Sequence, residues 1–213
     1  MFDLDGTLLD TLEDLTNSMN HALGLLGFPP RSRQECKYFV GDGIENFARR
    51  ALPEGFGDRE TVEKIVLAHR AYYAVHWADK TKPYPGIGEL LEELSARGVK
   101  MSVFSNKPDD VTQLNVGRFL SKWRFDLVRG ALPGVPLKPD PAGALRMADE
   151  LGVRPAEMLY LGDTNTDMQT AESAGFYPAG ALWGFRTREE LLESGAKVLL
   201  KRPMDLLKLL ESY

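Results

Sequence analysis

The sequence has few of the features that mark an extracellular, a membrane-spanning or a nucleic-acid-binding protein. Its 213 residues include one cysteine, Cys36, so no disulfide can form within the chain. We therefore expect a cytoplasmic protein, since a reducing compartment suits such a chain. No apolar run is long enough to cross a bilayer, and no signal peptide is evident. The net charge of -5 provides no basic field, so we expect neither a nucleic-acid nor a membrane partner.

The residues that are present favour a globular protein with a substantial core. Hydrophobic residues make up 43% of the chain and charged residues 27%, and the length allows one large or two small domains. The three histidines, His21, His69 and His76, fall in predicted helices with no pattern that pairs them at a metal. Cys36, also in a helical context, is expected to be a packing residue.

Hydrophobic periodicity divides the chain into a helical stretch and an alternating stretch. Residues 1–5 read as a strand, and helices are predicted at 11–27, 32–39, 44–51 and 59–77, with Asp10 or Thr11 as the first N-cap. Residues 82–86 form a linker rich in proline and glycine. Strands are then predicted at 99–104, 125–129, 158–161, 177–182 and 197–200, a turn at 105–108, and helices at 87–97, 109–120, 142–151, 165–174, 188–193 and 203–211.

This order predicts an α/β fold with an inserted helical domain. Strands that alternate with helices favour a mostly parallel, Rossmann-like sheet covered on both faces. Residues 1–13 and 81–213 are assigned to this core domain, and residues 14–80 to an α-helical cap domain. Ligands of such sheets bind at the carboxyl ends of the strands, so chemically active side chains are expected there.

The first of these strand ends carries two acids, Asp3 and Asp5, in the stretch M-F-D-L-D-G-T. Residues i and i+2 of an extended segment point to the same side, so their carboxylates should repel and their pKa values should separate. A metal cation would relieve that repulsion. The alternative is an ordinary strand and turn at Gly6, because Asp-Gly is a common turn dipeptide.

Further polar side chains are predicted at the same edge of the sheet. Ser105 and Asn106 end one strand, and Asp163 ends another, with Asp167 one helical turn later. Lys138 lies in the turn before the helix that leads into that second strand. Acids, a hydroxyl and a lysine suit phosphoryl transfer assisted by Mg²⁺. Taken singly, Ser105 and Asp163 could cap helices, and Lys138 could be solvated.

Four of these motifs together resemble the haloacid dehalogenase superfamily: D-L-D-G-T (3–7), V-F-S-N (103–106), K-P-D-P (138–141) and G-D-T-N-T-D (162–167). The resemblance covers essentially the whole chain, the helical cap included. It implies that Asp3 is the nucleophile and Asp5 the general acid and base. It implies further that Mg²⁺ is held by Asp3, Asp5 (through its carbonyl oxygen) and Asp163, that Ser105, Asn106 and Lys138 bind the phosphoryl group, and that Asp167 and Thr7 support them.

Two stretches, 40–52 and 181–186, resemble the phosphoglycolate phosphatase subgroup. On that resemblance Gly41, Asp42 and Gly43 would form a loop over the substrate, and Arg49 or Arg50 would meet a substrate carboxylate. The alternatives are an inter-helix turn and a solvated arginine. Only Met1 and Phe2 precede Asp3, fewer apolar residues than the family usually has, so we expect an apolar extension to raise the unfolding midpoint.

The function predicted is therefore a Mg²⁺-dependent phosphatase that hydrolyses a small phosphorylated metabolite through an aspartyl-phosphate, as a monomer or homodimer. A phosphomutase that uses the same aspartyl-phosphate is the alternative within enzymes. A dehalogenase is disfavoured because that chemistry needs neither Mg²⁺ nor an acid at Asp5. A non-catalytic binding protein on the same scaffold is disfavoured by the complete set of site residues.

Overall fold

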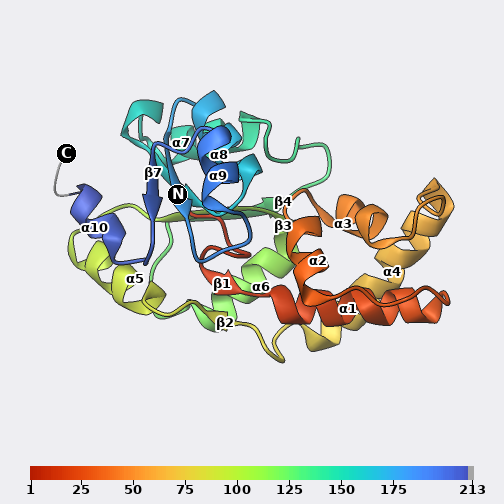
Figure 1. Ribbon diagram of the computed structural model, residues 1–213. Coiled ribbons are helices and arrows are strands. Elements are labelled where there is room, and N and C mark those ends of the chain that lie inside the picture. Colours follow the sequence, from red (N-terminus) through yellow and green to blue (C-terminus); the bar gives the residue numbers. More distant parts are fainter. Residues whose placement is uncertain (211–213) are drawn as a thin grey trace. The chain divides into compact units, whose positions relative to one another are not determined.

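A computed structural model describes residues 1–210 and divides the chain into two compact units (Figure 1). The first, here called the core unit, comprises Met1–Leu9 and Pro83–Tyr213, and the second, the helical unit, comprises Asp10–Lys82. The core unit is α/β with parallel strand pairing, and the helical unit contributes four helices, so the predicted fold class is confirmed.

The core unit is built on a parallel sheet into which the N-terminal residues are inserted. The Phe2 N–H donates to the carbonyl of Ser102 at 2.8 Å, and the Asp3 N–H donates to the carbonyl of Leu161 at 2.9 Å. These bonds place the N-terminal segment between β3 and β5. The pairs β3–β4, β5–β6 and β6–β7 are all parallel. The strands are β3 (Ser102–Pro108), β4 (Leu127–Ala131), β5 (Leu159–Gly162), β6 (Tyr177–Ala181) and β7 (Val198–Leu200).

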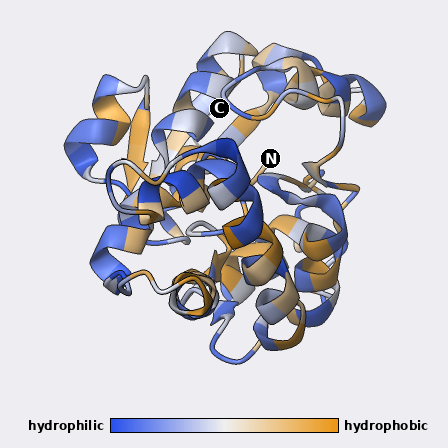
Figure 2. Cartoon of the chain, turned by 90° about the vertical axis from the view of Figure 1, so that its right-hand side faces the viewer, coloured by the Kyte–Doolittle hydropathy of each residue, from blue (hydrophilic) through white to orange (hydrophobic). Residues whose placement is uncertain are grey.

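Helices cover both faces of this sheet. Successive strand residues point to opposite sides, so the sheet has an apolar face on each side for helices to pack against. Met1 and Phe104 join the core beneath α7 and α8, whereas their neighbours Phe2 and Val103 join the core beneath α5, α6 and α10. In Figure 2 the helices carry alternating hydrophobic and hydrophilic bands, as amphipathic helices do. The helices are α5 (Ile87–Ala96), α6 (Asp109–Phe119), α7 (Ala142–Leu151), α8 (Asn165–Ser173), α9 (Arg188–Glu193) and α10 (Asp205–Leu210), with a short 3₁₀ turn, η1 (Pro155–Glu157).

Two strand predictions are wrong at the ends that bear the polar residues. Residues 105–108, expected to be a turn, continue β3 to Pro108, because the strand shifts register after Phe104 and Pro108 then pairs with Ala131. Residues 1–5 contribute only bridge pairs, whereas the first continuous strand is β1 (Leu9–Asp10), which pairs with β2 (Lys82–Pro83). The last predicted helix is described from Asp205 to Leu210, and its final predicted position, 211, lies outside the described residues.

The helical unit is held by α1 packed along α4, with α2 and α3 completing it. Its interior contains Met19, Leu23 and Ile65, and Cys36 is fully buried there, as a packing residue should be. The helices are α1 (Leu12–Leu25), α2 (Arg33–Phe39), α3 (Ile44–Ala51) and α4 (Arg59–His76). Within residues 1–210, no helix combines the length and the apolar character needed to cross a membrane.

The start of α1 decides between the two predicted N-cap residues, Asp10 and Thr11. Thr11 occupies the N-cap position, and Asp10 lies in β1 with its carboxylate 3.4 Å from Arg33. Asp14 in the first turn is buried and accepts hydrogen bonds from the N–H groups of Lys80 and Thr81 and from the Thr81 hydroxyl, at 2.7–3.0 Å. One carboxylate therefore ties the beginning of α1 to the segment that leads into β2.

Candidate active site

Three buried carboxylates meet at the carboxyl edge of the core sheet. Asp3 follows the inserted N-terminal segment, Asp163 follows β5, and Asp167 lies in the first turn of α8. One oxygen from each lies within 4.8 Å of the others, and all three residues are buried. This is the only such group of acidic, histidine or cysteine side chains found among residues 1–210, and it contains no histidine.

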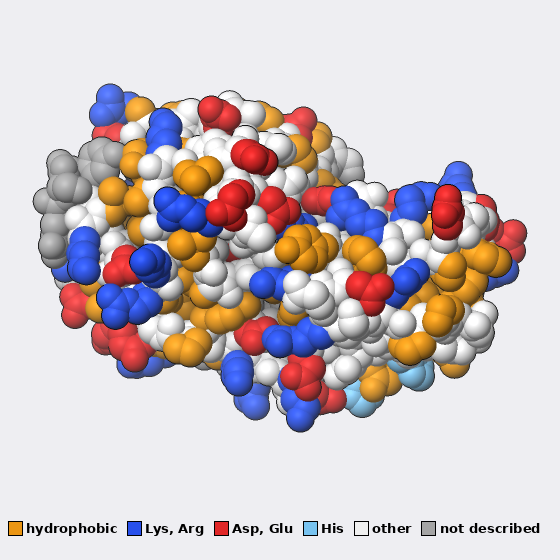
Figure 3. Space-filling model, viewed as in Figure 1, with side chains coloured by type: hydrophobic (Ala, Val, Ile, Leu, Met, Phe, Trp, Pro, Cys, Tyr) orange, Lys and Arg blue, Asp and Glu red, His pale blue; other side chains and the backbone are white. Residues whose placement is uncertain are grey.

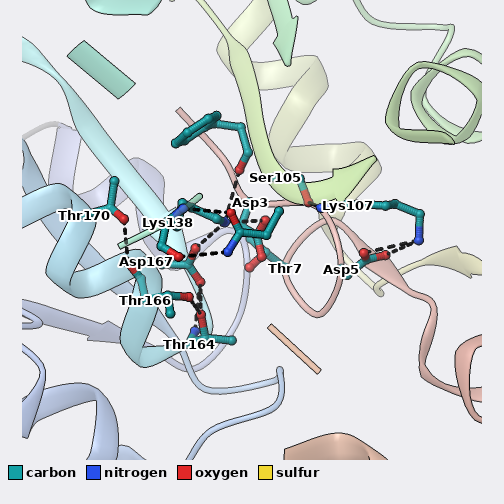
Figure 4. Close-up of polar contacts among 12 residues, drawn as sticks. Asp3, Asp5, Thr7, Ser105, Lys107, Lys138, Thr164, Thr166, Asp167 and Thr170 are labelled. Atoms are coloured by element: carbon teal, nitrogen blue, oxygen red, sulfur yellow. Dashed lines mark hydrogen bonds and ion pairs between the residues drawn. The ribbon is translucent and has the colours of Figure 1, made fainter. Parts of the chain in front are cut away.

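Lys138 provides the positive charge of this cluster (Figure 4). Its Nζ atom lies 2.8 Å from Oδ1 of Asp3 and 2.6 Å from Oδ1 of Asp167. The Tyr160 hydroxyl, 2.9 Å away, accepts a third hydrogen bond from the same ammonium. Lys138 is buried, so the alternative of a solvated lysine is excluded.

Asp167 is oriented by contacts on both of its oxygens. Oδ1 accepts from Lys138, while Oδ2 accepts from the N–H groups of Asp163 and Thr164 at 3.1 and 2.9 Å and from the Thr164 hydroxyl at 2.7 Å. Thr164 is the N-cap of α8, so Asp163 is not that cap. With both oxygens engaged, Asp167 is arranged to fix Lys138 rather than to meet a ligand.

Asp163 is aimed by groups on two loops. Its Oδ1 accepts from the Thr7 hydroxyl at 2.6 Å, and its Oδ2 accepts from the Phe185 N–H at 2.7 Å. Gly6 has φ +92°, and a Cβ there would come within 2.2 Å of Asp163 Oδ2. The backbone after Asp5 can therefore pass this close to the carboxylate only with glycine at this position.

Ser105 and Asn106 lie in the extended end of β3. Ser105 does not cap α6, because that helix begins at Asp109 and its N-cap is Pro108. The side-chain oxygen of Asn106, Oδ1, accepts from the backbone N–H of Lys138 at 2.8 Å. The side-chain amide nitrogen of Asn106, Nδ2, donates to the backbone carbonyl of Lys138 at 3.0 Å. Asn106 thus holds the backbone of Lys138 with two bonds, and any effect it has on a phosphoryl group would include the placement of that lysine.

Asp5 pairs with a different lysine from Asp3. Lys107 Nζ donates to both carboxylate oxygens of Asp5, at 3.1 and 3.2 Å. Figure 4 shows this pair to one side of the group formed by Asp3, Lys138 and Asp167. The two acids of the opening motif therefore have separate cationic partners, which fits two different tasks.

Burial dominates the electrostatics of the cluster. It raises the pKa of Asp3 from 3.8 to about 7, with repulsion from Asp167 adding to the effect and the charge of Lys138 opposing it. Repulsion from Asp5 raises the pKa of Asp3 as well, in the direction expected for two neighbouring carboxylates, but it is smaller than the other contributions. Burial and the charge of Asp3 also raise the pKa of Asp163. Burial alone would lower the pKa of Lys138, but Asp167 and Asp3 outweigh it and raise that pKa.

Comparison with known proteins identifies the family to which this arrangement belongs. The model of the haloacid dehalogenase-like hydrolases matches residues 1–181. The chain belongs to this family. Relatives at 31% identity place it in a phosphoglycolate phosphatase-like subgroup, whose members are phosphoric monoester hydrolases.

Individual relatives support the subgroup. Phosphoglycolate phosphatase 1 of Pseudomonas aeruginosa is 31% identical over 97% of this chain and 77% of the relative. The phosphoglycolate phosphatase of Aquifex aeolicus is 31% identical over 100% of this chain and 96% of the relative. A solved structure from Lactobacillus delbrueckii subsp. bulgaricus, whose assignment as a phosphoglycolate phosphatase is itself a prediction, superposes with a TM-score of 0.90 at 31% identity, covering 96% of this chain and 94% of that one.

The donor set of this hydrolase fits a hard divalent cation. Three buried carboxylates face one lysine, which leaves an excess of negative charge that a cation such as Mg²⁺ would compensate. Oxygen donors alone are the ligands that Mg²⁺ prefers. Asp3 and Asp163 are the acids suited to contact it directly, because both oxygens of Asp167 are already engaged by the lysine, the tyrosine and the start of α8.

The predicted cap residues have partners within the helical unit. The carboxylate of Asp42 pairs with Arg50, and Arg49 donates to the carbonyl of Gly57. Gly43, with φ +87°, precedes α3 directly. These contacts account for a structured loop, and a role for Gly41, Asp42, Gly43 and Arg49 in substrate binding stays a prediction.

Three contributors to this hydrolase's site were missed from the sequence: Lys107, Tyr160 and the backbone of Phe185. Lys107 lies two residues after Ser105 on an extended segment, and that spacing was a usable signal. An aromatic residue inside a strand predicts packing, so the hydroxyl contact of Tyr160 could not be anticipated. The position of the Phe185 N–H depends on the course of the loop after β6, which local sequence patterns do not determine. The stretch that contains it, 181–186, resembles the subgroup, but that resemblance did not indicate this contact.

Proposed function

We propose that this chain is a Mg²⁺-dependent phosphatase that hydrolyses a small phosphomonoester, resembling phosphoglycolate, through an aspartyl-phosphate. The observation that carries the proposal is the buried carboxylate of Asp3, held 2.8 Å from Lys138 Nζ beside Asp163. A carboxylate nucleophile next to a fixed cation is the arrangement that phosphoryl transfer requires. The names of its relatives point to the same chemistry.

Asp3 supplies the nucleophile. One of its oxygens bonds to phosphorus while the ester P–O bond breaks, and the departing oxygen takes a proton from Asp5. Asp5 then removes a proton from water, whose oxygen attacks the phosphorus. The bond between phosphorus and Asp3 breaks, which releases phosphate and restores the Asp3 carboxylate.

The other residues hold the phosphoryl group and the charges in place. Lys138 and Ser105 would contact its oxygens, and Asp167 fixes Lys138 through the 2.6 Å contact. Mg²⁺, held by Asp3, Asp163 and the carbonyl oxygen of Asp5, would offset the negative charge of the phosphoryl group and the acids. In this proposal the helical unit, 10–82, serves as a cap that restricts access of water.

The Asp3→Asn variant tests the proposal. We expect a wild-type protein that releases phosphate from at least one member of a phosphomonoester panel in Mg²⁺, and a variant that folds but loses at least about 10³-fold of this activity. The matched control is Asp149→Asn, an exposed acid on α7. Full activity of Asp3→Asn, or of the wild-type protein in excess chelator, would contradict the proposal.

A further inference from the structure

Tyr160 places a hydroxyl inside the charged cluster, and neither step of the proposed reaction uses it. The residue is fully buried on β5, in a core cluster whose other members are apolar. Phenylalanine would fill nearly the same space, so packing does not account for the hydroxyl. The hydroxyl oxygen lies 2.9 Å from Lys138 Nζ, 2.9 Å from the Phe104 carbonyl oxygen and 3.2 Å from Asp167 Oδ1.

This hydroxyl is a neutral hydrogen-bond acceptor for the lysine. Its single hydrogen is donated to the Phe104 carbonyl or to Asp167, which leaves its lone pairs to accept from the ammonium of Lys138. Burial raises the pKa of the hydroxyl, although the charge of Lys138 opposes the effect, so the group stays protonated. A carboxylate in its place would add negative charge beside the phosphoryl group, and a hydroxyl does not.

The ammonium of Lys138 has three hydrogens and three near acceptors. Asp3 Oδ1 lies 2.8 Å from Nζ, Asp167 Oδ1 lies 2.6 Å away and the Tyr160 hydroxyl 2.9 Å, whereas the Phe104 carbonyl is farther, at 3.3 Å. The proposed reaction changes one of these acceptors. When an oxygen of Asp3 bonds to phosphorus, its carboxylate loses the charge that attracts the ammonium.

Lys138 then keeps two unchanged acceptors, Asp167 and Tyr160. Two acceptors fix the direction of the third N–H, whereas Asp167 alone would let the ammonium turn about a single hydrogen bond. That third N–H faces Asp3 and the phosphoryl group bonded to it. In the first step the ionised Asp3 holds the ammonium itself, so the contribution of Tyr160 is greatest in the second step, hydrolysis of the aspartyl-phosphate.

We propose that Tyr160 is a positioning residue that holds Lys138 beside the phosphorylated Asp3 and thereby speeds hydrolysis of the aspartyl-phosphate. This inference rests on the proposed function and deepens it. In that step the oxygen of water bonds to phosphorus, a water proton passes to Asp5, and the bond between phosphorus and Asp3 breaks. The electron pair of that bond returns to the Asp3 carboxylate, where an N–H of Lys138 stabilises the charge that forms again.

The test is Tyr160→Phe, which removes the hydroxyl and keeps the ring. Wild type and variant receive, in Mg²⁺, the phosphomonoester that the wild type hydrolyses fastest, labelled in its phosphoryl group, and then an excess of unlabelled ester. Rapid quenching in acid follows the loss of label from the protein. We expect Tyr160→Phe to lose its label about 10- to 100-fold more slowly than the wild type. Its kcat/KM, which reports the steps up to release of the alcohol, is expected to stay within about threefold of wild type.

The two readouts separate positioning in the second step from a purely structural role. If Tyr160 only supports the fold, both steps slow together and kcat/KM falls as much as the rate of label loss, which overturns the inference. An unchanged rate of label loss would also overturn it and would leave the proposed function standing. Tyr160→Leu, which likewise lacks the hydroxyl, provides the comparison if Tyr160→Phe does not fold.

The matched control is Tyr177→Phe, which removes a hydroxyl from the neighbouring strand, β6. Tyr177 pairs with Leu159 at the start of β5, and its ring lies under Lys197 Nζ at 5.6 Å, so it belongs to a different group of contacts from Tyr160. We expect this variant to match the wild type in both readouts. A wild type that releases phosphate from none of the esters would overturn the proposed function together with the inference.

Discussion

The Thr7 hydroxyl helps to orient the Asp163 carboxylate. Thr7 belongs to the opening motif, and its donor lies 2.6 Å from Asp163 Oδ1 although 156 residues separate the two. Groups that orient a metal-binding carboxylate are often as important as the ligand itself. Thr7 looks like an ordinary turn residue in the sequence, and only the return of the chain after β5 gives it this partner.

We predict that Thr7→Val raises the Mg²⁺ concentration for half-maximal activity about 10- to 100-fold, because the isosteric side chain cannot donate to Asp163. Thr7→Ser keeps the hydroxyl and is expected to stay near wild type. The measurement is a Mg²⁺ titration of phosphate release. An unchanged Mg²⁺ requirement in Thr7→Val would mean that the Phe185 N–H alone suffices to orient the carboxylate.

The backbone conformation of Gly6 and its closeness to Asp163 lead to a second prediction. With φ +92° and an Asp163 oxygen 2.2 Å from any added Cβ, Gly6→Ala must displace either the backbone or the carboxylate. We expect a loss of at least about 1 kcal/mol in the free energy of unfolding and a much weaker response to Mg²⁺. Gly98→Ala is the matched control, since Gly98 also has a positive φ, +68°, but open space around its Cβ position. Equal losses in both variants would show that backbone strain, not contact with Asp163, is responsible.

Secondary-structure elements were largely recoverable from periodicity, and the exceptions are informative. Helix α3 and helix α7 have the predicted bounds, because glycine and proline punctuate them clearly. The end of β3 was misread because Asn-Lys-Pro is a strong turn signal, whereas pairing of Pro108 with Ala131 extends the strand. The site edge was still located correctly, since Ser105 and Asn106 fall at the carboxyl end of that strand in either reading. The hydrogen bonds and ion pairs within the site could not be predicted from the sequence, because they depend on the tertiary structure.

Hydrogen bonds of one carboxylate also connect two secondary-structure elements, α1 and β2. The Asp14 carboxylate satisfies two backbone N–H groups and one hydroxyl in the segment just before β2. We predict that Asp14→Ala destabilises the helical unit by about 2–3 kcal/mol, because three donors, two of them buried, lose a charged acceptor. Hydrogen exchange of the α1 and α4 amides measures this directly. Glu13→Ala, at an exposed position of the same turn, is the control, and similar exchange in both variants would contradict the prediction.

At the scale of the whole molecule, the buried site differs in its distribution of charge from the face of the surface that Figure 3 presents. Figure 3 shows acidic and basic side chains interspersed on the face it presents, with no extended region of one sign. The buried cluster instead collects three acids around one lysine. The stability of the protein should therefore depend on pH through this cluster.

We predict that titration of this cluster lowers the stability of the metal-free protein as the pH rises from about 4 to above 7, whereas the buried N-terminal amine of Met1, whose pKa is lowered from 8.0 to about 5, acts in the opposite direction. Folding raises the pKa of Asp3 from 3.8 to about 7, so across this range the folded state holds a proton that the unfolded state has released. The stabilisation is fully present below the unfolded pKa and lost above the folded one, and Asp163, also raised, acts in the same direction. Mg²⁺ favours the ionised acids and should oppose the loss.

Thermal unfolding at pH 5 and pH 8, in chelator and in saturating Mg²⁺, measures this effect. We expect the gain in Tm from Mg²⁺ to be larger at pH 8, and about 2.7 kcal/mol of stabilisation when Mg²⁺ is 100-fold above its Kd. Asp3→Asn removes one of the titrating groups and should flatten the dependence. A change in the metal-free Tm between pH 5 and pH 8 that is the same in Asp3→Asn as in the wild type would contradict the assignment of these acids to one buried cluster.

The two bonds between Asn106 and the backbone of Lys138 have a consequence for engineering. They join the end of β3 to the segment before α7, 32 positions later, so the shape of each segment depends on the other. A chimera that imports one of these segments from a relative would mismatch the other and misplace the lysine. Productive grafts between members of this family should therefore exchange the two segments together, as a single transplantable module.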